Sequence, residues 1–232
     1  MGLNPMKHVY RAFGLALIIC VLVRVTHAQT LVAFNFNDQS NQTATLTAST
    51  LASNVTANIF SVSDGGFTST NFTTSSPPDS PAVSDSGSWV AATPTKYFAF
   101  TVTPSSGYSV VITNISFDYR QTASGALIYQ VNIGQNANLA SGSFTTDSAW
   151  HLVSQSITLS ALTNANEVRI YGYGNGSGGS GSFSIDRVIL TGTVSAIPEP
   201  ATYAAIFGAV ALVSAGWHCR RQKQKSSATL TT

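Results

Sequence analysis

Apolar and polar residues alternate along most of the chain between residues 29 and 196. The clearest case is Lys96–Thr103, in which Phe98, Phe100 and Val102 occupy every second position. A period of two places these three side chains on one face of an extended strand, whereas a helix would spread them around its surface. No stretch of this region shows a convincing repeat of 3.6 residues. We therefore predict an all-β region from residue 29 to residue 196.

The stretch Tyr108–Arg120 is long for a single strand, and its apolar residues change parity halfway along. Val110 and Ile112 have one parity. The later residues with the other parity are Ile115, Phe117 and Tyr119. Because side chains alternate strictly between the two faces, both sets can point inward only if a bulge or bend lies near Asn114.

The other predicted strands are short and occur about every ten residues, separated by turns rich in Gly, Pro, Ser and Asn. They are predicted at 31–36, 127–133, 167–173 and 183–194, with two more around Trp150–Leu159 and weak ones at 44–50 and 55–61. This spacing, without an internal repeat, predicts a single antiparallel β-sandwich or jelly-roll-like domain. We assign it to residues 29–196.

The composition limits what this domain can bind. Charged residues make up 9% of the chain, against about 25% in an ordinary globular protein. Between residues 29 and 197, eight acidic residues stand against four basic ones, so the domain is mildly acidic and a nucleic-acid partner is not expected. Both cysteines, Cys20 and Cys219, lie in apolar end segments, which excludes a disulfide framework or a thiolate metal site in the domain.

The first 28 residues have the pattern of a secretory signal peptide. Lys7 and Arg11 precede an apolar run from Ala12 to Val23, and small residues end the segment at Ala28. We expect export by the Sec machinery and cleavage by signal peptidase after Ala28. The alternative is an uncleaved anchor, but twelve apolar residues are short for a bilayer about 30 Å thick.

The C-terminal segment, 197–225, combines three features in a fixed order. Pro198, Glu199 and Pro200 form a stiff break, the apolar stretch Ala201–Trp217 follows, and a basic group begins with Arg220 and Arg221. Seventeen helical residues span about 26 Å, enough for a short transmembrane helix. The basic group acts as a cytoplasmic stop, which leaves the sandwich outside the cytoplasm. Residues 226–232 are predicted to form a disordered tail.

This arrangement of Pro-Glu-Pro, apolar helix and arginine cluster resembles the PEP-CTERM sorting segment of Gram-negative bacteria. The resemblance covers residues 197–225, and the chain departs from it in an 11-residue extension, Gln222–Thr232. It implies an exosortase partner, processing at Pro198-Glu199-Pro200, and transfer from the inner membrane to the cell surface or extracellular matrix. Proteins of this family commonly accompany exopolysaccharide and biofilm production. The alternative is a plain membrane anchor with an incidental Pro-Glu-Pro.

The domain itself resembles the β-sandwich bodies of such proteins more loosely, through FDYR at Phe117–Arg120 and FSIDRVILTG at Phe183–Gly192. Those bodies are similar in outline to jelly-roll carbohydrate-binding modules. The resemblance implies the architecture and no site residue.

The residue types of the domain give little support for a catalytic site. The single histidine of the domain, His151, has no G-x-S-x-G elbow to accompany it, and Glu167 is the only glutamate of the domain. Gly174–Gly179 matches G-x-G-x-x-G but precedes a strand, which predicts a loop and no nucleotide site. We expect no enzyme and no cofactor other than calcium.

The residues of the domain offer two candidate binding sites. Carbohydrate would be bound by aromatic side chains that border loops. For each of these residues the alternative is burial in the core. The candidates are Trp89, Trp150, Tyr171 and Tyr173. Structural calcium would be bound by Asp38 and Asp186 if the first and last strands pair, with isolated surface carboxylates as the alternative.

The expected function is therefore that of a non-enzymatic surface or matrix protein, sorted by an exosortase and associated with exopolysaccharide. The alternative is a carbohydrate-binding module acting on extracellular polysaccharide. A polysaccharide hydrolase or lyase is a third hypothesis, against which the scarcity of His, Glu and Lys in the domain argues.

Overall fold

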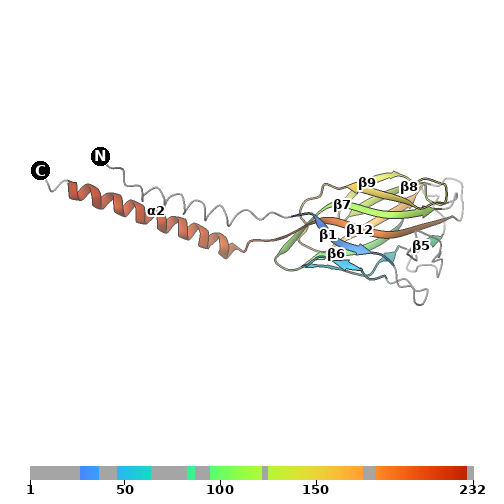
Figure 1. Ribbon diagram of the computed structural model, residues 1–232, viewed down its shortest axis with the longest axis horizontal. Helices are drawn as coiled ribbons and strands as arrows, with labels where there is room; N and C mark the ends of the chain where they lie inside the picture. Colours follow the sequence, from blue (N-terminus) through green and yellow to red (C-terminus); the bar gives the residue numbers. More distant parts are fainter. Residues whose placement is uncertain are drawn as a thin grey trace.

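A computed structural model describes residues 27–36, 46–63, 83–86, 95–121, 125–174 and 181–228. These residues form two antiparallel β-sheets and one C-terminal helix (Figure 1). The sheets pack face to face around one hydrophobic core, which confirms the predicted all-β sandwich. The predicted signal peptide at 1–28 lies almost wholly outside the described residues.

The first sheet has the strand order β10-β7-β12-β1-β2, with β5 also paired to β12. Its strands are β1 (Gln29–Phe34), β2 (Thr50–Leu51), β5 (Val83–Ser86), β7 (Tyr108–Gln121), β10 (His151–Ser156) and β12 (Ser182–Ala196). The two long strands β7 and β12 form its centre.

The second sheet has the strand order β3-β6-β11-β8-β9, with β4 also paired to β6. Its strands are β3 (Val55–Ala57), β4 (Ser61–Val62), β6 (Lys96–Pro104), β8 (Ile128–Ile133), β9 (Asn136–Ser143) and β11 (Asn166–Tyr173). All its pairings are antiparallel.

The predicted irregularity in β7 is confirmed. Thr191 of β12 lies opposite Asn114, but its neighbour Gly192 lies opposite Ile112, so Thr113 is the extra residue of a bulge. Ile112 before the bulge and Ile115 after it are both fully buried. One additional residue therefore allows a strand with two parities to bury both apolar sets.

Some strand predictions are wrong at their limits. The strand predicted at 44–50 is reduced to Thr50–Leu51 among the described residues, and the one predicted at 55–61 is two separate short strands. Strand β9 was not predicted, because Asn136–Ser143 is largely polar and exposed at the edge of its sheet. Edge strands lack the apolar alternation on which the prediction depends.

Aromatic side chains join the two sheets at the centre of the core. Phe34 of β1 lies 4.8 Å from Phe100 of β6 and 5.3 Å from Phe60, measured between ring centroids. Phe36 and Phe98 complete this group, and all five rings are at most 1% exposed. Because the domain has no disulfide, apolar burial of this kind is its main source of stability.

Gly192 is required where β12 crosses the bulge of β7. A Cβ atom at this position would lie 2.0 Å from the carbonyl oxygen of Val111 and 2.8 Å from Leu31 Cδ1. The backbone oxygen cannot move without breaking the pairing of β7 with β12. We expect Gly192→Ala to destabilise the domain by about 1–3 kcal/mol, measured as a lower urea midpoint. Gly208→Ala, at a position with open space around it, is the control; equal midpoints for the two variants would contradict this packing.

The described chain enters and leaves the sandwich at one end. Gln29 of β1 lies opposite Gly192 of β12, and Ile197 N donates to Gly107 O at 2.8 Å just after β12 ends. The helix α2 (Pro200–Ala228) follows and extends away from that end (Figure 1). Its segment Ala201–Cys219 is long and apolar enough to cross a membrane. The helix continues to Ala228, three residues into the segment predicted as a disordered tail.

Candidate functional site

The outer face of the second sheet carries aromatic, charged and amide side chains in adjacent rows. Tyr171 of β11 lies directly opposite Tyr97 of β6 on one side and Gln130 of β8 on the other. Arg169 lies opposite Asn132 in the next row. Their sequence neighbours Phe98 and Ile170 point into the core, so these side chains point outward. We call this surface the polar face; it comprises Tyr97, Gln130, Asn132, Glu167, Arg169, Tyr171 and Tyr173.

Arg169 is the centre of the polar face. Its guanidinium carbon lies 4.8 Å from the centroid of the Tyr97 ring, and its Nε donates to Oε2 of Glu167 at 2.5 Å. Nη1 donates to the Tyr171 hydroxyl at 3.5 Å. The Tyr97 and Tyr171 rings lie 5.0 Å apart between centroids. The guanidinium plane is therefore fixed by three neighbours, although its side chain is 41% exposed.

These contacts keep Arg169 protonated. The hydrogen bond to Tyr171, and then the carboxylate of Glu167, raise the pKa of Arg169 above its ordinary value, although partial burial acts in the opposite direction. The charge is consequently permanent, and Arg169 acts as a fixed hydrogen-bond donor rather than as an acid or base.

The amide groups beside Arg169 are also held in place. Gln130 Nε2 donates to Asn132 Oδ1 at 2.9 Å, and the same oxygen accepts from Asn138 N at 2.7 Å. In the neighbouring strand β6, Thr101 N donates to the side-chain oxygen of Asn58. A ligand binding here would meet donors and acceptors whose orientation is already set, which reduces the entropy lost on binding.

The structure brings two of the four predicted carbohydrate-binding residues together. Tyr171 and Tyr173 lie two positions apart on β11 and share the polar face. Tyr171 is only 6% exposed, because neighbouring groups on the polar face cover it, whereas Tyr173 is half-buried. Trp150 precedes β10 in the first sheet and does not belong to this face, and Trp89 lies outside the described residues.

Sequence reasoning missed Tyr97 and Arg169. The sequence does indicate that Tyr97 points outward, because Phe98 and Phe100 have the opposite parity and are predicted to point into the core. Its pairing with Tyr171 could not be read from the sequence, because no local pattern states that β6 and β11 are neighbours.

The calcium hypothesis required the first and last strands to pair, and β1 does pair with β12. Asp38 lies outside the described residues, while Asp186 is fully buried and lies opposite Asp118 of β7. Arg187 N donates to Asp186 Oδ1 at 2.7 Å, and the Arg187 side chain forms an ion pair with Asp118. Among the described residues no group of three His, Cys, Asp or Glu side chains that could hold a metal ion occurs. Calcium binding stays a prediction.

His151 contacts the loop before β10 and the neighbouring strand β7. Its Nε2 donates to Asp147 Oδ1 at 2.7 Å, and its ring stacks on Tyr119 at 5.4 Å between centroids. The Tyr119 hydroxyl in turn accepts from Thr145 N at 2.8 Å. These contacts tie the His151 ring to the loop before β10 and to Tyr119 of β7.

The pKa of Asp147 makes the stability of this loop depend on pH in the acidic range. The hydrogen bond from His151, followed by that from Ala149 N, lowers the pKa of Asp147 below its ordinary value of 3.8. A depressed pKa stabilises the folded loop above pH 3.8, and this contribution is lost as the pH falls through the folded-state value. In an NMR titration we expect the carboxyl midpoint of Asp147 below 3.8, and a rise toward 3.8 in His151→Ala. A wild-type midpoint at or above 3.8 would contradict these contacts.

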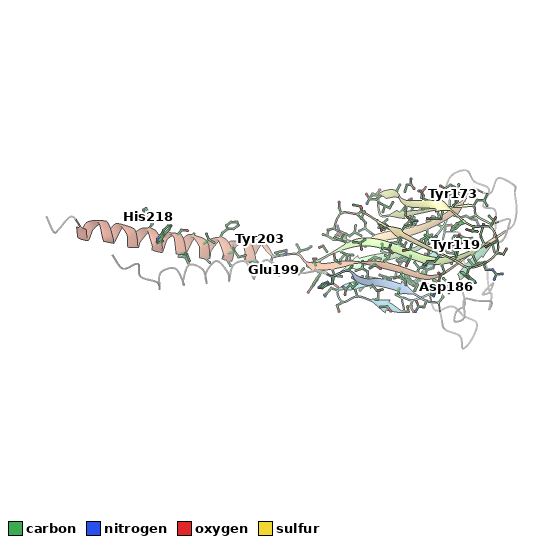
Figure 2. All side chains as sticks on the ribbon, turned by 45° about the horizontal axis from the view of Figure 1, so that its top comes forward. Tyr119, Tyr173, Asp186, Glu199, Tyr203 and His218 are labelled. Carbon is green, nitrogen blue, oxygen red and sulfur yellow. The ribbon has the colours of Figure 1, made fainter. Side chains whose placement is uncertain are left out.

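The predicted sorting motif lies in the linker between sandwich and helix. Pro198 and Glu199 are exposed, Pro200 begins α2, and Thr202 N donates to Glu199 O at 2.9 Å in the first helical turn. Arg220 and Arg221 lie within α2. Figure 2 shows Glu199 at the opposite end of the sandwich from Tyr173, Tyr119 and Asp186.

No protein-family model matches the chain, and no curated protein matches it. Among solved structures, a carbohydrate-binding module, CBM36, in complex with calcium and xylotriose is 17% identical, with a TM-score of 0.33 over 50% of this chain and 83% of that one. The K3 cleaved adhesin domain of Lys-gingipain from Porphyromonas gingivalis is 13% identical, with a TM-score of 0.36 over 70% and 99%.

A family 11 carbohydrate-binding module from Clostridium thermocellum, in complex with a β-1,3-1,4-mixed-linked tetrasaccharide, is 14% identical. Its TM-score is 0.33, over 70% of this chain and 96% of that one. Likenesses at this level do not indicate a ligand, and the sandwich assignment rests on the two sheets themselves.

Proposed function

We propose that the sandwich is a non-enzymatic, exported surface domain that binds extracellular polysaccharide through the polar face of its second sheet. This proposal combines the expected role of a surface protein with the alternative role of a carbohydrate-binding module. The observation that carries the proposal is the Arg169 guanidinium, held between the Tyr97 ring and the Glu167 carboxylate on an exposed sheet surface.

The chemistry of this surface fits sugars. A sugar ring presents hydroxyl groups around an apolar face, so it binds to flat aromatic or guanidinium surfaces flanked by amides and carboxylates. The polar face supplies each of these groups, already hydrogen-bonded to one another. An open sheet face also suits a long polymer, which must pass across the protein rather than enter a closed pocket.

Two substitutions test the binding surface. Tyr97→Ala removes the ring beneath Arg169, and Arg169→Ala removes the central donor; we expect each to weaken polysaccharide binding about tenfold or more, equivalent to about 1.4 kcal/mol. Arg120→Ala is the matched control, because Arg120 lies on the first sheet and donates to Ser148 O at 2.8 Å. Unchanged binding in both polar-face variants, measured by titration with the bound polysaccharide, would exclude this face.

The C-terminal segment determines the proposed location of the domain. An exosortase would process the chain at Pro198-Glu199-Pro200, after Sec-dependent export and while α2 holds it in the inner membrane. The exposure of Pro198 and Glu199 supports this proposal, since a membrane enzyme needs access to its motif, and so does the apolar length of Ala201–Cys219. Release would place the domain at the cell surface or in a biofilm matrix.

A further inference from the structure

We infer that the polysaccharide bound by the polar face is uncharged, an inference that rests on the binding function proposed above. Exopolysaccharides include both neutral polymers and polymers of uronic acids. The two classes need different partners, because a uronate carboxylate calls for an uncompensated cation while a neutral sugar calls for hydrogen-bond donors and acceptors of no net charge.

The central cation of the polar face already has a counter-ion. Arg169 Nε donates to Glu167 Oε2 at 2.5 Å, and Nη2 contacts the same oxygen. The two side chains are 41% and 38% exposed, so a ligand that reaches the guanidinium also meets the carboxylate. A uronate would gain attraction from one group and repulsion from the other at nearly the same distance.

The other side chains of the polar face are neutral. Tyr97 supplies a ring and a hydroxyl group, while Gln130 and Asn132 supply amides in the neighbouring strand β8. Beside these residues, the main-chain N–H of Thr101 in β6 donates to the side-chain oxygen of Asn58, which is also a neutral pair. Such groups match the alternating donors and acceptors of unmodified sugar hydroxyls.

The charge of the whole domain acts in the same direction. Residues 29–197 contain eight acidic and four basic residues, hence a net charge of −4 by this count. A polyanion would therefore be repelled at long range, over the screening length of about 8 Å at physiological salt, before any local contact formed. A neutral polymer meets no such barrier.

The test uses the full-length protein in detergent micelles, immobilised for biolayer interferometry. Three neutral probes are hydroxyethyl cellulose, galactomannan and soluble mixed-linkage β-glucan; polygalacturonate is the anionic probe. We expect binding to at least one neutral probe, with an affinity that changes less than about twofold between 50 and 500 mM NaCl, because no net charge is neutralised. Polygalacturonate should bind at least about tenfold more weakly.

Glu167→Gln makes the test specific to the polar face. It keeps the shape of the side chain but leaves Arg169 without its counter-ion, so polygalacturonate binding should increase at least about tenfold and should weaken as salt increases. Asp147→Asn makes the same change of charge in the loop before β10, and it should leave polygalacturonate binding unchanged.

The outcomes separate this inference from the proposed function. Binding of polygalacturonate by the wild-type protein as tightly as any neutral probe overturns the inference, as does an equal gain of polygalacturonate binding in both charge variants. If none of the four polymers binds, or if binding survives Tyr97→Ala and Arg169→Ala unchanged, the proposed function itself fails.

Discussion

Replacing Phe100 with alanine is expected to lower the free energy of unfolding by about 3–5 kcal/mol, a large part of the 5–15 kcal/mol typical of a domain. Phe100 is 1% exposed and contacts Phe34 of the opposite sheet and Phe60 at centroid distances of 4.8 and 5.7 Å. The substitution leaves a cavity between two sheets whose strands cannot move together without breaking their pairing.

Urea unfolding of the full chain in micelles would measure this effect as a lower midpoint with an unchanged slope. Leu152→Ala is the control, since Leu152 is 67% exposed on the edge strand β10 and should change stability by less than about 0.5 kcal/mol. A loss below about 1 kcal/mol in Phe100→Ala would contradict the central position of this ring in the core.

The second large effect concerns processing at the C-terminus. Coexpressed with an exosortase, the wild-type protein is expected to lose α2, whereas Glu199→Ala should retain it because the processing motif is damaged. Mass spectrometry of the mature protein distinguishes the two forms directly. Ser195→Ala is the control, since Ser195 belongs to β12 and lies just outside the linker. Wild-type protein that still ends at Thr232 would contradict the sorting proposal.

A change to Pro200 extends the same test. Pro200 is the first residue of α2, where proline suits a helix because the missing N–H is not needed there. Pro200→Ala should therefore preserve the helix and block processing. Retention of α2 in this variant would indicate that the motif is recognised by its residues rather than only by its position before a helix.

The proposed binding surface and the proposed processing motif lie toward opposite ends of the sandwich. Tyr97 lies seven residues before Pro104 on β6, about 23 Å at the rise of an extended strand, and Pro104 belongs to the end from which α2 leaves. Figure 2 likewise places Tyr173 far from Glu199. We therefore expect the polar face to be accessible both before and after removal of the helix.

The sandwich itself was predictable from the sequence because its core strands alternate in a simple way. The change of parity in β7 was enough to predict a bulge or bend near Asn114, since two apolar sets in one strand allow no regular solution; the structure places the bulge at Thr113. Strand β9 could not be predicted in the same way. Its sequence is polar, and it becomes a strand only because β8 offers it a pairing edge.

The candidate site was predictable only in part, for a related reason. Tyr171 and Tyr173 share a parity within one strand, so their common face follows from local sequence. Tyr97, Gln130 and Asn132 join them through pairing between strands that are far apart in the sequence. The ion pair of Asp118 with Arg187 could not be predicted either, because it forms at the second bulge of the β7–β12 pair, which lies in β12, where Arg187 adopts a φ of 44°.

The most direct test of the proposed binding surface is hydrogen–deuterium exchange of the full-length protein with and without the neutral polysaccharide that it binds. Slower exchange is expected in β6, β8 and β11, around Tyr97, Gln130 and Arg169, with no change in β7 and β10 of the first sheet. Protection confined to the first sheet, or to the loop containing Asp147, would contradict the assignment of the polar face as the binding surface.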